Sequence, residues 1–164
     1  SIADMDRNYY ESHSLTLAQH PSETDERLML RLLIFALHAH EHLQFTKGLS
    51  TDDEPDIWQK DLSGTIEHWI DLGQPDEKRI KKAIGRAQQV SIVCYGGPGE
   101  VWQQQQTGKA FLDKVSIWHV SADECKQLGQ MLEKSMTLNC SIQDGSAWLS
   151  SNTNSIEISP KAFH

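Results

Sequence analysis

Two aspartates, Asp56 and Asp71, are the residues of this chain best placed to do chemistry together. Residues 55–61 and 66–72 have the composition of strands, and the Leu-Ser-Gly-Thr sequence between them is typical of a hairpin turn. Strand side chains alternate between two faces, so a turn centred between residues 63 and 64 places both acids on one face. The expected facing pairs are Asp56 with Asp71, Trp58 with Trp69, and Lys60 with Glu67.

Two facing carboxylates repel each other unless something neutralises them. Directly opposed Cβ atoms of an antiparallel pair lie about 5 Å apart, and like charges there are destabilising. A hard divalent cation such as Mg²⁺ binds through one or two carboxylates, and water and phosphate oxygens complete its octahedron. The pair therefore predicts a magnesium site. The alternative is a hairpin end that opens into solvent, and a register slip of one residue would separate the acids.

A third acid, Glu26, belongs to a helix expected over about 23–44. Residues 28–37 are apolar over most of the helix circumference, so we expect this helix to be largely buried. Glu26 points with Leu30 and Leu33, at the edge of the buried face. The alternative role of Glu26 is to stabilise the positive end of the helix dipole. The expected solvent-facing stripe, at four-residue spacing, is Glu23, Arg27 and Arg31.

A second helix, expected over 76–87, carries the strongest positive cluster of the chain. Solvation of an exposed helix face explains such a cluster without any function, and contact with an anionic partner is the functional alternative. The five basic side chains that flank its apolar stripe are Lys78, Arg79, Lys81, Lys82 and Arg86.

Strands and helices alternate through the middle of the chain, which is typical of a right-handed parallel sheet. The C-terminal part changes to short strands with Asp-Gly and Asn-Thr-Asn turns, which indicates antiparallel pairing. The predicted fold is therefore α/β, with a mixed β-sheet flanked by helices. The remaining expected elements are strands 11–19, 90–95, 114–120, 136–143, 147–150 and 156–159, and helical segments 100–107 and 122–132.

The composition limits the class of protein. The 164 residues fit a single domain, 1–164, and 38% of them are hydrophobic. A net charge of −8 argues against nucleic-acid binding through a broad basic surface, but it permits a local basic patch. No stretch has the roughly 20 apolar residues of a membrane span, and the N-terminus lacks the pattern of a signal peptide. Three widely spaced cysteines fit a reducing cytoplasm.

Other patterns give weaker indications of chemistry. His38, His40 and His42 could hold a transition metal, but imidazoles near a helix C-terminus also stabilise the dipole. The glycine-rich loop 96–99 lacks the Lys and Ser/Thr of a phosphate-binding loop, so we expect a strand-to-helix turn there. The sequence contains neither a serine nucleophile elbow nor a cysteine catalytic signature.

Five segments, taken together and in this order, resemble the bacterial YaeQ family over nearly the whole chain. Members of that family begin with an additional strand before a segment like residues 1–7, so we expect the N-terminal strand to be incomplete here. The segments are 20–27 (His-Pro-Ser-Glu-Thr-Asp-Glu-Arg), 53–56 (Asp-Glu-Pro-Asp), 69–75 (Trp-Ile-Asp-Leu-Gly-Gln-Pro), 79–83 (Arg-Ile-Lys-Lys-Ala) and 136–138 (Met-Thr-Leu).

YaeQ proteins are similar in fold to the PD-(D/E)XK phosphodiesterase superfamily, which includes many restriction endonucleases. The resemblance implies a restriction-endonuclease-like core with extra C-terminal antiparallel strands. It also implies that Glu26 matches the helix acid of that superfamily, Asp56 its Pro-Asp acid and Asp71 its second acid. These three residues would then be the metal ligands.

The lysine that the superfamily carries two positions after the second acid is absent, because Gly73 stands there. Some members take the lysine from the following helix, so Lys82 or Lys81 could replace it. Lys78 lies on a similar face of that helix, and Gln74 is a further polar candidate.

The resemblance implies metal-assisted hydrolysis of nucleic acid with Mg²⁺ or Mn²⁺. Glu26 would orient the metal or its water, and a helix lysine would stabilise charge on the phosphate. The alternative is a nuclease-like domain that has lost catalysis and serves as a binding or regulatory module. The missing lysine and the acidic net charge favour this alternative, whereas the retained acids and the basic helix favour hydrolysis.

Overall fold

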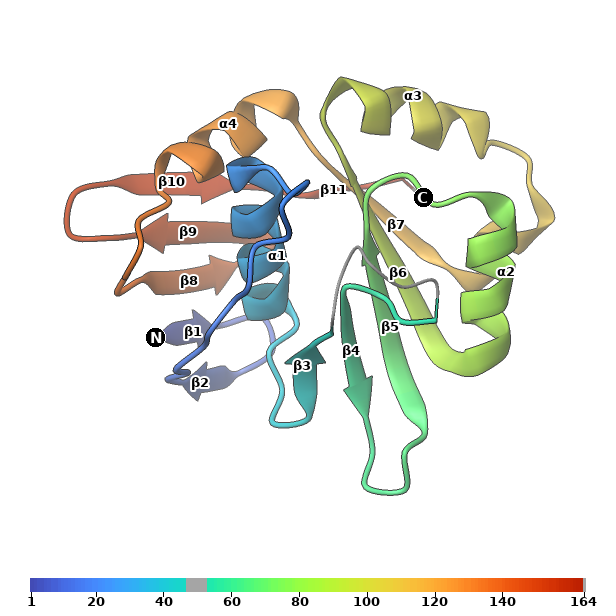
Figure 1. Ribbon diagram of the computed structural model, residues 1–164, viewed down its shortest axis with the longest axis horizontal. Coiled ribbons are helices and arrows are strands. Elements are labelled where there is room, and N and C mark those ends of the chain that lie inside the picture. The colour runs from blue at the N-terminus through green and yellow to red at the C-terminus, as the bar shows by residue number, and fades with distance from the viewer. Residues whose placement is uncertain (47–52, 164) are drawn as a thin grey trace.

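The computed structural model describes residues 1–46 and 53–163, which form two mixed β-sheets and four α-helices (Figure 1). These described elements confirm the mixed α/β class. None of the helices is long and apolar enough to cross a membrane. The helices are α1 (Asp25–Leu37), α2 (Glu77–Arg86), α3 (Gly96–Gln105) and α4 (Ala122–Gln130), with a 3₁₀ segment at Ala110–Lys114.

The six-stranded sheet contains the hairpin and the parallel strands. Strands β5, β6 and β7 run parallel, as the alternation of strands and helices predicted, and the other neighbours pair antiparallel. The order is β11 (Lys161–Ala162), β7 (Ser116–Val120), β6 (Ala87–Tyr95), β5 (Ile66–Leu72), β4 (Ile57–Lys60) and β3 (Leu43–Phe45).

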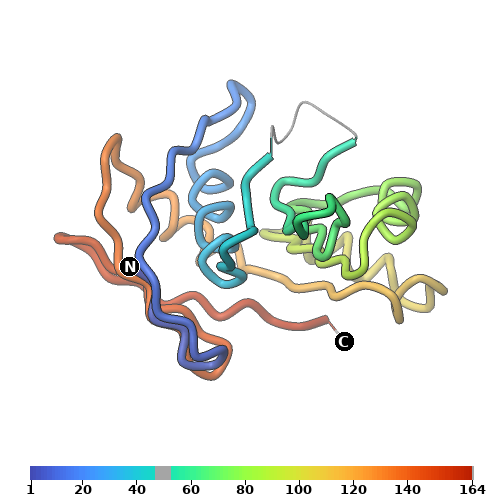
Figure 2. The backbone as a smooth tube through the Cα atoms, turned by 90° about the horizontal axis from the view of Figure 1, so that it is seen from below, coloured from blue at the N-terminus to red at the C-terminus, as the bar shows by residue number. Residues whose placement is uncertain are grey.

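The five-stranded sheet joins the two ends of the chain. Strands β8, β9 and β10 pair antiparallel, as expected for the C-terminal part, and β1 pairs parallel with β8. The chain then crosses from β10 to β11 of the other sheet (Figure 2). The order is β10 (Ser155–Ile158), β9 (Ser146–Ser150), β8 (Asn139–Gln143), β1 (Ile2–Asp4) and β2 (Tyr9–Glu11).

Two hydrophobic cores lie on opposite faces of the six-stranded sheet. The first joins α1, α4 and the five-stranded sheet to Ile57 and Ile70. The second packs Trp58 and Trp69 against α2, α3 and the 3₁₀ segment. Successive residues along β4, and along β5, thus pack into different cores, because the side chains of a strand point alternately to its two faces.

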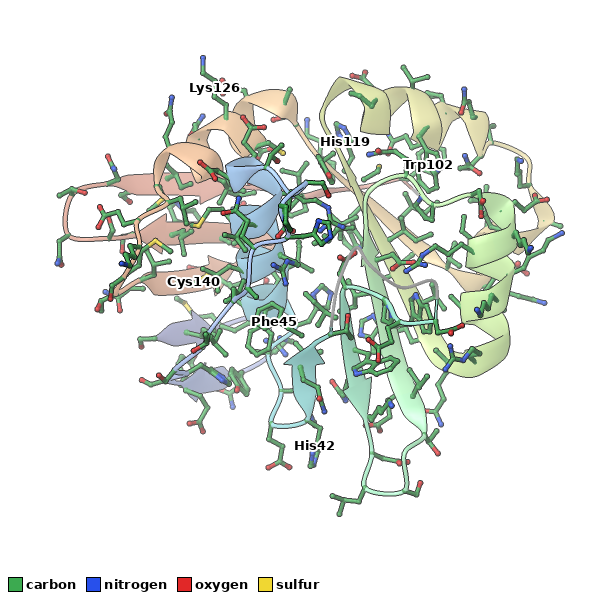
Figure 3. All side chains as sticks on the ribbon, in the orientation of Figure 1. His42, Phe45, Trp102, His119, Lys126 and Cys140 are labelled. Carbon is green, nitrogen blue, oxygen red and sulfur yellow. The ribbon has the colours of Figure 1, made fainter. Side chains whose placement is uncertain are left out.

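Helix α1 is shorter than the expected 23–44. The Thr24 side chain caps its first turn, and the helix ends at Leu37. Residues 38–42, His-Ala-His-Glu-His, turn the chain back into β3. Phe45 of β3 (Figure 3) stacks on Phe35 of α1 with ring centroids 4.8 Å apart. The boundary was wrong because residues 38–42 contain neither glycine nor proline, the usual signals of a helix end.

The strand expected at 11–19 was also wrong. Strand β2 ends at Glu11, and residues 12–20 have no regular secondary structure. They pass alongside α1 (Figure 2). Alternating side chains alone do not make a strand, because a strand also needs a hydrogen-bonded neighbour. The strand expected at 136–143 begins only at Asn139.

The hairpin register is confirmed at the open end and wrong near the turn. Trp58 lies opposite Trp69, with ring centroids 6.3 Å apart. A bulge just before Lys60 shifts the ladder, so that Lys60 pairs with Ile66 and not with Glu67. The Lys60 ammonium lies 3.8 Å from the centroid of the Trp58 ring.

The bulge follows from the conformation of the turn. The Asp61 carboxylate accepts hydrogen bonds from the backbone N–H groups of Ser63 and Thr65, both at 2.9 Å. Gly64 adopts φ +90°, which is accessible to glycine at little cost. A side chain that binds the turn from within stabilises a loop longer than the sequence pattern predicted.

Candidate functional site

Asp56 and Asp71 lie opposite each other at the open end of the hairpin. Asp56 directly precedes β4, and one further step of the pairing between Ile57 and Ile70 places it opposite Asp71 of β5. Their exposed fractions are only 5% and 4%. The expected acid pair is therefore present, and it is buried instead of opening into solvent.

Asp56 is held by α1 and by the opposite strand. Its Oδ1 accepts a hydrogen bond from Arg27 Nη2 at 2.9 Å, and its Oδ2 accepts one from the Leu72 backbone N–H at 2.8 Å. Burial raises the pKa of the Asp56 carboxyl above its usual value; Arg27 and the Leu72 N–H oppose this rise, and the charge of Asp71 adds to it. Both oxygens of Asp56 thus have a donor.

Asp71 is held by the first turn of α2. Arg79 Nε donates to Asp71 Oδ2 at 2.9 Å, and Arg79 Nη2 donates to Oδ1 at 3.0 Å, which makes a bidentate pair. Trp69 Nε1 also donates to Oδ2, at 3.1 Å. Arg79 Nη2 further donates to the Glu54 carbonyl at 2.8 Å, so the same arginine fixes the chain that leads into β4.

Glu23, which lies just before the Thr24 cap of α1, adds a third buried acid to these contacts. Its Oε2 accepts hydrogen bonds from Arg27 Nη1 at 2.8 Å and Arg31 Nε at 3.1 Å, and its Oε1 accepts one from Arg31 Nη2 at 2.9 Å. Burial by itself lowers the pKa of Arg27, but the charge of Asp56 and the hydrogen bonds to both acids raise it above its usual value. We call the following set the acid–arginine network: Glu23, Arg27, Arg31, Asp56, Asp71 and Arg79.

The network corrects the expected solvent-facing stripe of α1. Glu23, Arg27 and Arg31 are all buried. Because α1 is apolar over most of its circumference, its charged row also faces the interior, where each member finds an opposite charge. Within the described residues, no buried side-chain nitrogen or oxygen lacks a hydrogen-bond partner.

A comparison with known proteins decides the family. The family model described as YaeQ protein matches residues 1–160. The chain belongs to the YaeQ family. The resemblance carried by the five sequence segments is thereby confirmed.

Several YaeQ relatives match the chain over nearly its whole length. Uncharacterized YaeQ proteins of Salmonella typhi and Escherichia coli K12 are 44% and 42% identical to it, over 99% of this chain and 91% of each relative. The crystal structure of the YaeQ protein from Xanthomonas axonopodis pv. citri is similar with a TM-score of 0.94 at 42% identity, covering 99% of this chain and 93% of that one. The structure from Pseudomonas syringae is similar with a TM-score of 0.92 at 33% identity, covering 99% and 91%.

In this YaeQ-family chain, Glu26 is an exposed residue of α1 that packs against α4. A Cβ atom placed on Gly129 of α4 would lie 2.7 Å from Glu26 Cγ and 3.4 Å from Glu26 Cα. The acid that the structure joins to Asp56, through Arg27, is Glu23, which lies just before the Thr24 cap of α1. Glu23 precedes the helix, so the helical periodicity that singled out Glu26 could not place it.

The basic side chains of α2 take different partners. Lys82 Nζ lies 2.6 Å from Asp53 Oδ1, and Lys81 Nζ lies 3.5 Å from Glu77 Oε2. Lys78 is exposed. The residue of this helix that reaches the acid pair is Arg79, which the sequence placed in the basic cluster without assigning it to Asp71.

The backbone conformation at residue 73 accounts for the glycine at this position. Gly73 adopts φ +119°, a conformation that strains any residue with a side chain, and its N–H donates to the Val93 carbonyl at 2.9 Å. The exposed Gln74 follows it. A lysine at this position would strain the backbone that joins β5 to α2.

The network around the YaeQ acid pair does not fit a magnesium ion. Among residues 1–46 and 53–163, no three His, Cys, Asp or Glu side chains form a group able to hold a metal. One or two carboxylates can hold Mg²⁺ when their oxygens are free to coordinate it and water completes the octahedron. All four oxygens of Asp56 and Asp71 instead accept hydrogen bonds, and two arginines already neutralise the pair.

The histidines form no metal site among the described residues either. The His38 ring packs edge-on against His68, with ring centroids 5.3 Å apart, while the His40 and His42 rings lie 5.5 Å from each other. His68 Nε2 lies 2.7 Å from the Ser91 hydroxyl in the interior. Burial and the neighbouring His38 lower the pKa of His68 to about 3, so this imidazole is neutral at physiological pH.

Proposed function

We propose that this YaeQ-family protein acts without hydrolysing phosphodiesters, as a binding or regulatory module built on a nuclease-like PD-(D/E)XK core. One observation carries the proposal: both carboxylates of the facing acid pair are bound by arginines, Asp56 by Arg27 and Asp71 by Arg79. The arginines supply the neutralisation for which a cation was expected.

Electrostatics supports this reading of the acid pair. The acid–arginine network holds three guanidinium groups against three carboxylates, and all members except Arg79 are buried. A divalent cation between Asp56 and Asp71 would add two positive charges that nothing in the network balances. Uncompensated charge in a buried region is strongly unfavourable, because little solvent screens it.

The positions of the lysines also argue against phosphodiester hydrolysis. A lysine beside the second acid would stabilise charge on the reacting phosphate. Gly73 takes that position with a backbone conformation suited to glycine. The replacements considered from α2, Lys82 and Lys81, are paired with Asp53 and Glu77.

Metal-dependent hydrolysis of nucleic acid, with Mg²⁺ or Mn²⁺, is the second candidate. The facing acids and the basic helix beside them favour it, and the Arg79 side chain is 25% exposed. A phosphate group arriving from solvent could compete with Asp71 for this guanidinium. Hydrolysis therefore requires Arg79 to release Asp71. Nucleic acid as the partner and a cytoplasmic location stay predictions under either candidate.

Calorimetry with Mg²⁺ and Mn²⁺, together with a cleavage assay on single- and double-stranded DNA and RNA, separates the two candidates. The variants are Asp71→Asn and, as a control, Lys126→Ala, which changes an exposed lysine of α4 that has no proposed role. If the protein does not hydrolyse nucleic acid, wild type and Asp71→Asn should bind Mg²⁺ and Mn²⁺ equally weakly and show the same background cleavage. Ion binding and cleavage that persist in Lys126→Ala but disappear in Asp71→Asn would establish hydrolysis instead.

A further inference from the structure

The five-stranded sheet has one face on the first core and one face in solvent. Ser141 of β8 is partly exposed between two buried neighbours, and Trp148 of β9 is 40% exposed between two buried neighbours. Helices α1 and α4 cover the buried side (Figure 1). We call the outward-pointing side chains of β1, β2, β8, β9 and β10 the outer face.

One row of side chains crosses all five strands of the outer face. Adjacent strands lie about 4.8 Å apart, so Tyr10 of β2 and Trp148 of β9, which are three strands apart, stand about 14 Å from each other. The row has two small side chains between these two aromatic rings. Its members, each paired with the next, are Tyr10, Ala3, Ser141, Trp148 and Glu157.

Both rings are available to a ligand. Tyr10 is 55% exposed and Trp148 is 40% exposed. Within the part of the chain that the structure describes, neither ring stacks on another aromatic ring, and neither the Tyr10 hydroxyl nor the Trp148 indole N–H makes a hydrogen bond. Exposed aromatic residues with unused polar groups are typical of recognition surfaces.

The remainder of the outer face is polar but almost without charge. Asn139, Gln143, Ser146 and Ser150 flank the aromatic row, and Glu157 is the one charged residue among the outward-pointing strand positions that the structure describes. Single-stranded nucleic acid binds where basic side chains follow its phosphates, so this surface does not suit it. Tyr and Trp are enriched at protein interfaces but serine is depleted there, so the hydroxyl and amide side chains around these two rings favour a hydroxyl-rich ligand over a protein partner.

We propose that the outer face binds a neutral oligosaccharide. The apolar C–H faces of sugar rings would stack on Tyr10 and Trp148. The sugar hydroxyls would exchange hydrogen bonds with the Tyr10 hydroxyl, the Trp148 N–H and the flanking amide and hydroxyl side chains. A short chain of sugar rings would reach across the roughly 14 Å from one aromatic residue to the other. This site is separate from the acid–arginine network and does not depend on the function proposed for it.

The test is a titration of the protein with neutral oligosaccharides of glucose, N-acetylglucosamine and mannose, followed by the indole N–H resonance of Trp148 and by calorimetry. We expect at least one of these sugars to shift that resonance. Trp148→Ala and Tyr10→Ala should each weaken binding about tenfold, as expected for the loss of one aromatic contact. Leu62→Ala removes an exposed apolar side chain from the hairpin tip and should bind like wild type.

Four results would overturn the proposal. They are no shift with any sugar of the panel, equal binding by wild type and both aromatic variants, a response to single-stranded DNA in place of sugar, and a dimer of this chain that Trp148→Ala dissociates. Because both aromatic residues are exposed, their variants should keep the melting temperature of wild type, which is the check that each one is folded.

Discussion

Arg27 connects two acids of the network, so its removal tests the network directly. Its side chain is 8% exposed and donates to Glu23 Oε2 at 2.8 Å, to Asp56 Oδ1 at 2.9 Å and to the Leu72 carbonyl at 3.1 Å. Removing one partner of a buried ion pair costs about 3–5 kcal/mol, because the remaining charge stays buried without compensation. We expect Arg27→Ala to lower the free energy of unfolding by about that amount.

Urea unfolding and thermal melting measure this loss. A protein of this size loses about 2–4 °C in melting temperature per kcal/mol, so the midpoint should fall by about 6–20 °C. Arg86→Ala is the matched control. Arg86 is exposed at the end of α2 and donates to the Asp53 carbonyl at 2.6 Å, so its loss should cost about 1 kcal/mol.

A double-mutant cycle completes the test. Asp56→Ala removes the charge that Arg27 compensates, so the double variant Arg27→Ala/Asp56→Ala should be more stable than the sum of the single losses predicts, by at least about 1 kcal/mol. The reasoning is refuted if Arg27→Ala is no more destabilising than Arg86→Ala, or if the two losses simply add.

Three further predictions concern other parts of the chain. The fold lowers the pKa of His68 from 6.5 to about 3, so protonation below pH 6.5 favours the unfolded chain and the protein loses stability as the pH falls. Urea unfolding should show the free energy of unfolding falling by about 1.5 kcal/mol between pH 6.5 and 5. His68→Gln should abolish this pH dependence. Gly73→Ala should cost about 1–3 kcal/mol from backbone strain alone, since its φ is +119° and a Cβ there meets nothing within 4 Å; an unchanged melting temperature would contradict this. Gly129→Ala should destabilise the protein because the new Cβ would lie 2.7 Å from Glu26 Cγ. Adding Glu26→Ala should restore the melting temperature. A double variant that melts as low as Gly129→Ala alone would mean that Glu26 does not pack against Gly129.

The acid pair was predictable because two simple rules apply to it. The period of two and a recognisable turn put Asp56 opposite Asp71 and Trp58 opposite Trp69. The same rules failed at Lys60, since the Asp61 side chain stabilises a turn that the pattern of strand residues does not reveal.

The arginines were not predictable by the same means. The four-residue spacing of Glu23, Arg27 and Arg31 describes a charged row on α1, but it does not say whether that row faces solvent or a buried acid. One signal was available: a helix that is apolar nearly all round has no solvent face to receive such a row. Arg79 carried no comparable signal, because its lysine neighbours on α2 have the same charge and exposed positions.

The outermost strands of both sheets are short. Strands β2 and β3 have three residues each, β11 has two and β10 has four. An edge strand offers unpaired backbone groups to which a strand of another molecule can add, and a short edge offers few of them. The edge strands of each sheet are thus too short to pair with a long strand of another molecule. Aggregation of this protein is therefore expected to begin from unfolded chains and not from edge-to-edge pairing of folded ones.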